Sequence, residues 1–450
     1  MNDIARTAPA AASAPTRADP AASTSVLTRL LRQRLIDKLS CLRHGTLTLE
    51  DALGTVELGV AELGTTKEDR VHEGIAGAGH AQDVPLRVRI RVRDMAFYSV
   101  LAASGSVGAG GAYGDGLWQC DDLVGLVRLL VRNRDLLDGM EGGTARLGAA
   151  ALRLWHALRR NTREGSRRNI AAHYDLGNDF FGLFLSPDLM YSSALWSGDT
   201  DTLEQASTRK LDAICRKLGL RAGQRIVEIG TGWGGFALHA ARHYGCHVTT
   251  TTISREQHAL AAQRIAQAGL SDRVELLLRD YRDLDGQYDA VVSIEMIEAI
   301  GAQYMETYFA KIQSLLKPDG VALVQAITIE DHRYAQAVRE VDFIKRHVFP
   351  GSFIPSVQAM LAAKTRATSL ALVHLEDFGQ SYARTLQAWR ERFMAQLHAV
   401  HAQGFDDRFV RLWEFYLAYC EGGFRERSIG VAHLLLAQPG ARAGTAGWTA

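Results

Sequence analysis

From about residue 169 onward, short apolar runs alternate with longer segments whose apolar residues recur at helical spacing. The runs have the length of strands buried on both faces, and the longer segments have the periodicity of amphipathic helices. The expected strands are residues 225–230, 246–253, 274–279, 288–294 and 320–328, and the expected helices are 233–243, 254–268 and 301–316. Strands spaced in this way by helices predict parallel β-α-β units and a doubly wound α/β sheet.

A different pattern occupies the N-terminal part of the chain. Residues 86–93 alternate aliphatic side chains with arginine, which predicts a strand with one apolar face and one arginine face. That arginine face is either solvated, the simpler interpretation, or in contact with phosphate headgroups. Six glycines within residues 105–116 predict a loop ending at Trp118, and Asp121 with Asp122 predicts the start of a helix through Val131.

These patterns divide the chain into five segments. In order along the chain, they are a disordered N-terminus (1–26), a small mixed α/β domain (27–140), a basic linker (141–168), the main α/β domain (169–438) and a flexible tail (439–450). The linker carries several arginines around Trp155, a combination that suits an anionic membrane surface. An ordinary connector between domains is an equal alternative.

Composition narrows the class of protein. A chain of 450 residues with 47% hydrophobic and 22% charged residues is typical of a soluble globular protein with two or three domains. The net charge of +1 provides no general attraction to nucleic acid. Five cysteines without a C-x-x-C pair argue against a metal centre and a disulfide framework, and favour a reducing cytoplasm. No apolar run approaches the ~20 residues of a membrane span, and no secretory signal is present, so any work on lipids is expected at the inner membrane surface.

Residues 227–235 read V-E-I-G-T-G-W-G-G, which places a glycine-rich turn between an expected strand and an expected helix. Gly230 and Gly232 allow a tight turn and the close approach of a ligand to the backbone. The spacing differs from the G-x-G-x-x-G of dinucleotide sites, and no phosphate-binding loop motif is present. With Glu228 in front of it, the segment resembles the cofactor loop of S-adenosylmethionine methyltransferases. A purely structural turn is the alternative.

Further motifs follow in order along the chain. They are H-Y-D-x-x-N-D-F-F from residue 173, M-Y-S-S from 190, T-I-S-x-E-Q from 252, R-D-Y-R-D from 279 and E-M-I-E-A-I-G from 295. Together with the glycine loop they resemble the cyclopropane fatty acid synthase family over residues 85–438, with closer similarity to its plant-type and proteobacterial branch. The resemblance implies a Rossmann-like S-adenosylmethionine methyltransferase domain preceded by a smaller mixed α/β domain. It also implies methylene transfer to the cis double bond of a phospholipid acyl chain, through a carbocation.

The resemblance further implies a catalytic cluster. In the family, a bicarbonate ion held by polar groups removes a proton from the new methyl group, and the ring then closes. The positions that match this cluster are Ser193, Glu298, Gln325, Ile327 and Tyr382, and Cys420 matches a cysteine that is sometimes given as the active-site residue of the family. Ser193 and Gln325 stand where many members have cysteine and histidine, and both can still hydrogen-bond an anion. No step requires a thiolate, so Cys420 is as well explained by packing, and Glu298 and Tyr382 have the structural alternatives of a strand-end carboxylate and a packed aromatic.

A cofactor site for S-adenosylmethionine is implied by the same motifs. Its methionine end is expected at Tyr191 and Ser192, with Glu228, Gly230 and Gly232 beside it; its ribose and adenine are expected at Thr252, Ile253, Gln257, Tyr281 and Arg282.

The sequence leaves three functions open. The first is cyclopropane formation on membrane phospholipid, and the second is a fatty-acyl C-methyltransferase that leaves a methyl-branched or methylene lipid. The third, an inactive lipid-binding protein with a methyltransferase fold, is disfavoured because the cofactor loop and Glu298 are intact. The expected partner is a membrane phospholipid reached by peripheral contact through the N-terminal domain; a nucleic acid is not expected, and a homodimer is compatible with the sequence.

Overall fold

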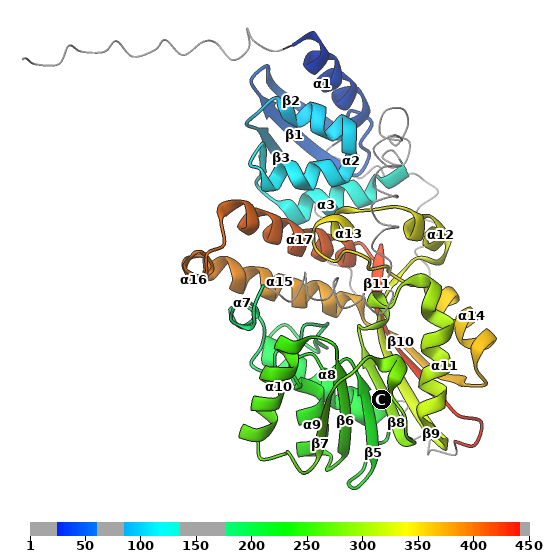
Figure 1. Ribbon diagram of the computed structural model, residues 1–450. Coiled ribbons are helices and arrows are strands. Elements are labelled where there is room, and N and C mark those ends of the chain that lie inside the picture. The colour runs from blue at the N-terminus through cyan, green and yellow to red at the C-terminus, as the bar shows by residue number, and fades with distance from the viewer. Residues whose placement is uncertain (1–24, 61–84, 136–175, 442–450) are drawn as a thin grey trace, which may run out of the picture.

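The computed structural model describes residues 25–60, 85–135 and 176–441 (Figure 1). The basic linker 141–168, the start of the H-Y-D motif, residues 1–24 of the expected disordered segment and the tail from 442 lie outside the described residues. Helix α1 (Val26–Leu39) begins directly after Ser25, whose side chain accepts a hydrogen bond from the backbone N–H of Thr28.

A seven-stranded sheet forms the centre of the C-terminal unit, with the order β10-β11-β9-β8-β5-β6-β7. Its strands are β5 (Arg225–Ile229), β6 (His247–Thr252), β7 (Val274–Leu278), β8 (Tyr288–Ile294), β9 (Leu316–Ile329), β10 (Ala371–Asp377) and β11 (Ile429–Ala437). The strands from β7 across to β9 pair in parallel, and β11 runs antiparallel between β9 and β10. The predicted doubly wound α/β sheet is confirmed, and β10 and β11 extend it beyond the predicted strands.

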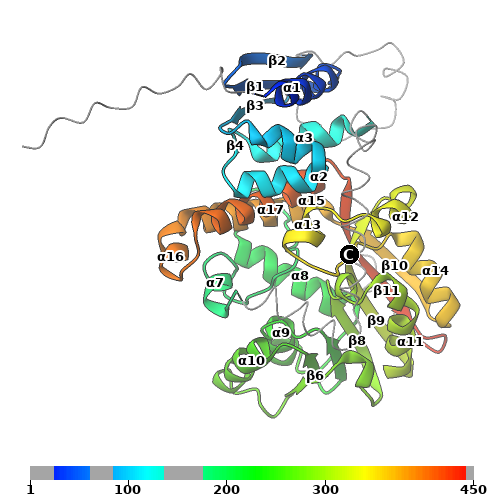
Figure 2. The ribbon, with the colours of Figure 1, turned by 45° about the horizontal axis from the view of Figure 1, so that its top comes forward.

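Helices cover both faces of this sheet (Figures 1 and 2). One face carries α8 (Leu203–Lys217), α9 (Gly235–His243) and α10 (Arg255–Gln267), and the other carries α11 (Met305–Leu315) and α14 (Val357–Ala367). Within β5, Ile226 is buried in the same cluster as Phe236 of α9, whereas Val227 is buried with Phe309 of α11. Strand β5 is therefore buried on both faces, as its mostly apolar sequence predicts.

The strand order reverses beside β5. The chain proceeds from β5 outward to β6 and β7, and then returns to β8 on the opposite side of β5. The loops that follow β5 and β8 therefore diverge and leave a crevice at the carboxyl ends of these strands. The glycine turn 230–234 follows β5 and the E-M-I-E segment follows β8, so the fold brings these two motifs to one place.

A smaller four-stranded sheet, with the order β2-β1-β3-β4, lies in the N-terminal unit. Its elements are β1 (Gly45–Asp51), β2 (Gly54–Val60), β3 (Arg87–Val92), β4 (Trp118–Cys120) and the helices α2 (Ala96–Gly114) and α3 (Leu123–Arg132). Strand β3 buries its aliphatic side chains and exposes its arginines, as the alternation predicts. Arg91 pairs with Glu50 at 3.2 Å, which favours a solvated face over a headgroup site. Asp122 caps α3 as expected, accepting a hydrogen bond from the backbone N–H of Gly125.

The predicted glycine loop at residues 105–116 is wrong. Most of this segment belongs to α2, which is interrupted by non-helical backbone at Gly105 (φ 55°). The later glycines let neighbouring side chains approach the helix, since a Cβ on Gly110 would lie 2.3 Å from Cδ2 of Phe343. The prediction failed because it considered the conformational freedom of glycine and not the side chains that pack against the helix.

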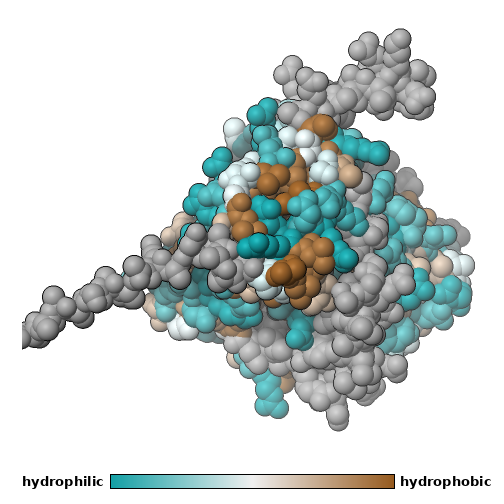
Figure 3. All heavy atoms as spheres, turned by 90° about the horizontal axis from the view of Figure 1, so that it is seen from above, coloured by the Kyte–Doolittle hydropathy of each residue, from teal (hydrophilic) through white to brown (hydrophobic). Residues whose placement is uncertain are grey.

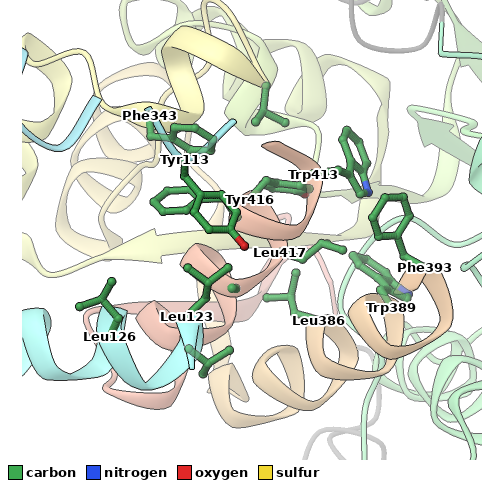
Figure 4. Close-up of a cluster of buried hydrophobic side chains, with 14 of the residues drawn as sticks. Tyr113, Leu123, Leu126, Phe343, Leu386, Trp389, Phe393, Trp413, Tyr416 and Leu417 are labelled. Atoms are coloured by element: carbon green, nitrogen blue, oxygen red, sulfur yellow. The ribbon is translucent and has the colours of Figure 1, made fainter. Parts of the chain in front are cut away.

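Two long helices, α15 (Gly379–Ala395) and α17 (Asp407–Arg425), lie between the two sheets (Figure 1). Helix α17 packs against α15 on one side and against α2 and α3 on the other. Figure 4 shows Trp389 of α15 and Trp413 of α17 in the same apolar cluster as Leu123 of α3, so one core joins the two units. The remaining α-helices are α7 (Asn178–Gly182), α12 (Asp331–Arg339), α13 (Phe343–His347) and α16 (Leu397–Ala402). Among the described residues, no helix is both long and apolar enough to cross a bilayer.

Candidate active site

A cavity of about 970 Å³ occupies the crevice and continues toward the N-terminal helices. Its walls come from the loops after β5, β6 and β8, from α17, and from α1, α2 and α3. The predicted cofactor residues that line it are Tyr191, Ser192, Glu228, Gly230, Gly232, Thr252, Ile253, Gln257, Tyr281 and Arg282. The predicted catalytic residues that line it are Glu298, Ile327, Tyr382 and Cys420, while Ser193 and Gln325 are fully buried beside it. All residues expected from the sequence are thus brought to one site.

The glycine turn after β5 leaves room for a ligand. Gly230 and Gly232 have φ values of 99° and 53°, which L side chains rarely adopt. A Cβ on Gly232 would meet no atom within 4 Å, so this backbone faces open space in the cavity wall. Glu228 lies at the end of β5 and accepts a hydrogen bond from the Thr250 hydroxyl at 2.6 Å. Burial raises the pKa of Glu228 to about 8.

The opposite end of the cofactor region suits a ribose and a planar ring. At the end of β6, the Thr252 hydroxyl donates to Oε1 of Gln257 at 3.0 Å. Asp280 accepts two hydrogen bonds from the Arg282 guanidinium, at 2.8 and 2.6 Å, and thereby holds it beside the ring of Tyr281. The Tyr281 hydroxyl is buried and has no hydrogen-bond partner among the described residues. An aromatic ring and a fixed guanidinium can both stack on a heterocycle, so these residues fit an adenine.

A buried lysine that the sequence did not reveal lies next to Ser192. Lys210 of α8 is fully buried, and its Nζ donates to Oγ of Ser192 at 2.8 Å. Burial lowers the pKa of Lys210 to about 8, and the negative charges of Glu295 and Asp188 oppose this shift. A lysine on an amphipathic helix is ordinarily expected at the surface, so the sequence contained no signal for it.

Two glutamates of the E-M-I-E segment enter the cavity, and the first of them was not predicted. Glu295 Oε1 accepts hydrogen bonds from the backbone N–H of Ser193 at 2.9 Å and from Nε2 of Gln325 at 2.7 Å. Its Oε2 accepts a hydrogen bond from the Tyr382 hydroxyl at 2.7 Å. Burial raises the pKa of Glu295, whereas the three donors lower it by stabilising the ionised form.

The second glutamate, Glu298, has a different environment. Its Oε1 accepts a hydrogen bond from the backbone N–H of Ile327 at 2.6 Å. Its Oε2 is buried and has no hydrogen-bond partner in the described part of the chain. Burial, with the nearby charge of Glu295, raises the pKa of Glu298 to about 8. The side chain is therefore mostly protonated at neutral pH.

A row of buried polar side chains orients Gln325. Its Oε1 accepts a hydrogen bond from Nε2 of His433 at 3.0 Å, and His433 Nδ1 lies 2.8 Å from Nζ of Lys217. Because an ammonium group only donates, we assign Nδ1 as the acceptor and Nε2 as the N–H donor. Lys217 also pairs with Glu376, and burial holds the pKa of His433 well below its usual value. A chain of hydrogen bonds therefore runs from Lys217 through His433 and Gln325 to Glu295, and each group donates to the next.

The predicted cluster is therefore assembled around a residue that the prediction omitted. Gln325 contacts a carboxylate through its amide, as expected of an anion-binding group. Ser193 contributes its backbone N–H instead of its hydroxyl, which donates to the carbonyl oxygen of the following residue. Tyr382 donates to Glu295 and not to Glu298. The sequence feature that could have predicted Glu295 is its position directly after the expected strand 288–294, three residues before Glu298.

A bicarbonate ion does not fit this cluster. The backbone N–H of Ser193, Nε2 of Gln325 and the Tyr382 hydroxyl already donate to Glu295. The backbone N–H of Ile327 donates to the other glutamate of the segment. The donors that the resemblance assigns to the ion are thus used by carboxylates of the chain itself.

Cys420 lies in the cavity wall on α17. Burial raises the pKa of its thiol, so the group is neutral near pH 7. A neutral thiol is a poor nucleophile, which agrees better with a packing role than with covalent catalysis.

Comparisons with known proteins show extensive similarity. A family model described as "Mycolic acid cyclopropane synthetase" matches residues 161–434. The tuberculostearic acid methyltransferase UfaA1 of Mycobacterium tuberculosis is 42% identical over 290 residues, which cover 62% of this chain and 67% of that protein. The cyclopropane-fatty-acyl-phospholipid synthase of Escherichia coli (strain K12) is 37% identical over 361 residues, which cover 80% of this chain and 90% of that protein.

Solved structures give the same result at the level of the fold. The cyclopropane synthase MmaA2 from Mycobacterium tuberculosis superposes with a TM-score of 0.56 at 28% identity, covering 60% of this chain and 98% of that structure. The mycolic acid cyclopropane synthase CmaA1, in complex with SAH and CTAB, gives the same TM-score, identity and coverage.

Proposed function

Since the chain belongs to the mycolic acid cyclopropane synthetase family and is an S-adenosylmethionine-dependent methyltransferase, we propose that it forms cyclopropane rings on unsaturated phospholipid acyl chains. One observation supports a lipid as the substrate. A single cavity joins the expected cofactor residues, two buried glutamates and an apolar passage between the N-terminal helices. A methyltransferase for a small polar substrate would not need such a passage.

The cofactor residues fit S-adenosylmethionine, which supplies a methyl group activated by a positively charged sulfur. The open backbone at Gly232 leaves space for its amino-acid end, next to Ser192 and the buried Lys210. Thr252 would receive the ribose and Tyr281 the adenine. These roles follow from the position of each residue around the cavity.

The walls of the cavity suit a reaction that passes through a carbocation. An alkene is a weak nucleophile, so the protein must hold the double bond in line with the methyl group. The cation that results must be protected from nucleophiles and water. Burial raises the pKa values of Tyr382, Tyr416 and Cys420, so these neighbours remain neutral and do not capture the cation as phenolate or thiolate.

We propose that the acyl chain reaches the site between the N-terminal helices. Leu35 of α1, Leu101 of α2 and Leu126 of α3 line this part of the cavity. Arg34 and Lys38 of α1 line it as well, and their positive charges would favour a lipid phosphate. In this proposal the N-terminal unit delivers the substrate.

We also propose that α1 contacts the membrane surface. Val26, Leu27 and Leu30 are 86%, 60% and 50% exposed, and they lie at the start of α1, the helix that lines the N-terminal part of the cavity. Figure 3, which looks down on the N-terminal unit, shows apolar side chains grouped among polar ones.

Replacing Leu27 and Leu30 together by glutamate should lower co-sedimentation with liposomes and leave S-adenosylmethionine binding unchanged. Unchanged co-sedimentation would exclude α1 as the contact.

A second candidate function is the formation of a methyl-branched or methylene lipid. It is favoured by the 42% identity to a protein named as a tuberculostearic acid methyltransferase. The two functions share the methyl transfer and differ in the fate of the cation. Proton loss from the new methyl group with bond formation to the cationic carbon closes a ring, whereas proton loss from a neighbouring chain carbon leaves a methyl-branched alkene. A 1,2-hydride shift followed by proton loss from the methyl group leaves a methylene lipid.

The experiment that tests these functions uses the purified protein, S-adenosylmethionine and liposomes of cis-unsaturated phospholipid. The fatty acid methyl esters are analysed by mass spectrometry and by proton NMR, because a ring and a methylene isomer have the same mass. A gain of one CH₂ with upfield ring protons supports cyclopropane formation, and the same mass without ring protons supports the second candidate. Cofactor binding without any lipid product would contradict both.

A further inference from the structure

We propose that Glu295 is the general base of the reaction and takes the place that the family resemblance assigns to a bicarbonate ion. This inference rests on the proposed function, because it concerns the proton that leaves when the ring closes. If Glu295 is the base, the enzyme needs no added anion for that step.

The hydrogen-bond donors around Glu295 are already in use. A carboxylate and a bicarbonate are both planar anions that accept hydrogen bonds at oxygen, so the same donors can serve either of them. In this chain the backbone N–H of Ser193, Nε2 of Gln325 and the Tyr382 hydroxyl converge on the Glu295 carboxylate at 2.7–2.9 Å. A second anion in the same place would lack donors and would be repelled by Glu295.

These donors are also held in position. Gln325 cannot rotate its amide away from Glu295 without giving up the hydrogen bond from His433 to its Oε1. His433 is in turn oriented by Lys217. The three residues come from β9, β11 and α8, so three separate elements cooperate to present one N–H to Glu295.

The backbone at Glu295 has an unusual conformation. Its φ of 49° lies in the left-handed region, which a residue with a side chain seldom adopts. Its own N–H donates to the carbonyl oxygen of Gln325 at 2.8 Å. Glycine would occupy this conformation without strain, so a glutamate here is most simply explained by a function of its carboxylate.

One oxygen of the Glu295 carboxylate is able to accept a proton. Oε1 of Glu295 receives two donors, whereas Oε2 receives only the Tyr382 hydroxyl among the described residues, which leaves a lone pair on Oε2. Glu295 lines the cavity, and the buried ammonium of Lys210 favours its negative charge.

Atoms and electrons balance in the proposed step. The π electrons of the alkene form the new C–C bond while the C–S bond of the cofactor breaks, and the sulfur keeps that pair. Oε2 of Glu295 then takes a proton from the new methyl group, and the C–H electron pair closes the ring onto the cationic carbon. The products are the cyclopropane, S-adenosylhomocysteine and a proton that Glu295 later releases to water.

The first part of the test measures bicarbonate binding and does not depend on the lipid reaction. Sodium bicarbonate is titrated into carbonate-free protein in a calorimeter, with sodium chloride as the control. We expect no saturable binding to the wild type and saturable binding to Glu295→Gly, which vacates the donors and suits the backbone. Saturable binding to the wild type that is lost in Gln325→Leu would overturn the proposal.

The second part measures lipid product in carbonate-free buffer with and without added bicarbonate. We expect the wild type to be indifferent to bicarbonate and Glu295→Gln to lose on the order of 10²–10⁴-fold in product formation. Glu295→Gly should lose activity in the carbonate-free buffer and recover about tenfold or more when bicarbonate is added. Binding of S-adenosylmethionine to each variant checks that the fold is retained.

The outcomes separate the two proposals. A wild type that requires bicarbonate, or a Glu295→Gln variant that keeps its rate, overturns the assignment of Glu295 as the base. If the wild type makes no lipid product, the proposed function fails, and the calorimetric titration still decides whether Glu295 occupies the anion site.

Discussion

The charge of Glu298 changes within the range of pH used for assays, so replacing it should have a pH-dependent effect. Its pKa in the folded protein is about 8, above the ordinary value of a carboxyl group. At a pH between these two pKa values, Glu298 is protonated in the folded protein and ionised in the unfolded chain. The stabilisation from this group is therefore complete at low pH and is lost as the pH rises toward 8, by up to about 1.4 kcal/mol per pH unit.

Glu298→Gln removes this titration, so the melting temperature of the variant relative to wild type should rise from pH 6 to pH 8. Thermal unfolding followed by circular dichroism at pH 6, 7 and 8 measures the difference. A difference that does not vary with pH would show that Glu298 is ionised throughout in the folded protein.

His433 provides a second prediction, because it touches the reaction only through Gln325. His433→Phe keeps a buried ring but removes the N–H that holds Oε1 of Gln325, so the amide can turn away from Glu295. We expect kcat for lipid product to fall by about tenfold, equivalent to about 1.4 kcal/mol, with no change in the affinity for S-adenosylmethionine.

His374→Phe is the matched control, since His374 lies on the neighbouring strand β10 and its Nδ1 has no hydrogen-bond partner in the described part of the chain. Equal losses in the two variants would mean that the effect arises from strand packing and not from the orientation of Gln325.

The predicted residues of the site can be identified from the sequence, whereas the unpredicted ones are placed in the site by tertiary structure. Glu298 belongs to the E-M-I-E-A-I-G motif and Tyr382 matches a position of the family, so the sequence was sufficient to name them. His433 reaches Gln325 because β11 pairs antiparallel with β9 in a register that places the two residues opposite each other. Such a partnership depends on the register between strands distant in sequence, which no local pattern records.

The parallel strands of the main sheet, β5 to β9, were predictable from their own sequence patterns, whereas β10 and β11 were not predicted. Strands β5 and β8 are short and mostly apolar, and α9 and α10 have helical spacing. Helix α2 was not predictable in this way, because its glycines leave room for side chains of α13 and α17 that pack closely against it. The same composition is typical of a loop when no partner is known.

Two adjacent glycines of α2 test this explanation. A Cβ on Gly110 would lie 2.3 Å from Phe343, whereas a Cβ on Gly111 would have its nearest neighbour, His347, at 3.8 Å. Gly110→Ala should therefore destabilise the protein by about 1–3 kcal/mol through overpacking. Gly111→Ala should be neutral or stabilise by up to about 1 kcal/mol, because alanine favours the helix.

Urea unfolding of the two variants measures both values. Equal stability of the two would show that the glycines are tolerated for reasons other than the close contact.

At the scale of the whole molecule, the N-terminal unit is joined to the methyltransferase sheet through α15 and α17, and the cavity crosses that junction. Sequence patterns could separate the two units but could not show that they share a cavity. The shared cavity depends on how helices from distant parts of the chain pack together, as the rings of Tyr113 in α2 and Phe415 in α17 do, with centroids 5.6 Å apart. The passage proposed for the acyl chain and the residues expected at the cofactor consequently line parts of the cavity that belong to different units.

This separation leads to a prediction about adjacent alanines on α2. Ala102 lines the cavity, whereas Ala103 is exposed and lies outside its lining. Ala102→Phe fills part of the passage and should raise KM for lipid about tenfold, equivalent to about 1.4 kcal/mol, while the dissociation constant for S-adenosylmethionine stays unchanged. Ala103→Phe adds the same ring on the outer face and should change neither value.

Liposome assays with acyl chains of increasing length measure KM for the lipid, and calorimetry measures the dissociation constant for S-adenosylmethionine. If Ala102→Phe weakened cofactor binding as well, the two units would be coupled more closely than the shared cavity requires, whereas an unchanged KM would place the acyl chain outside this passage.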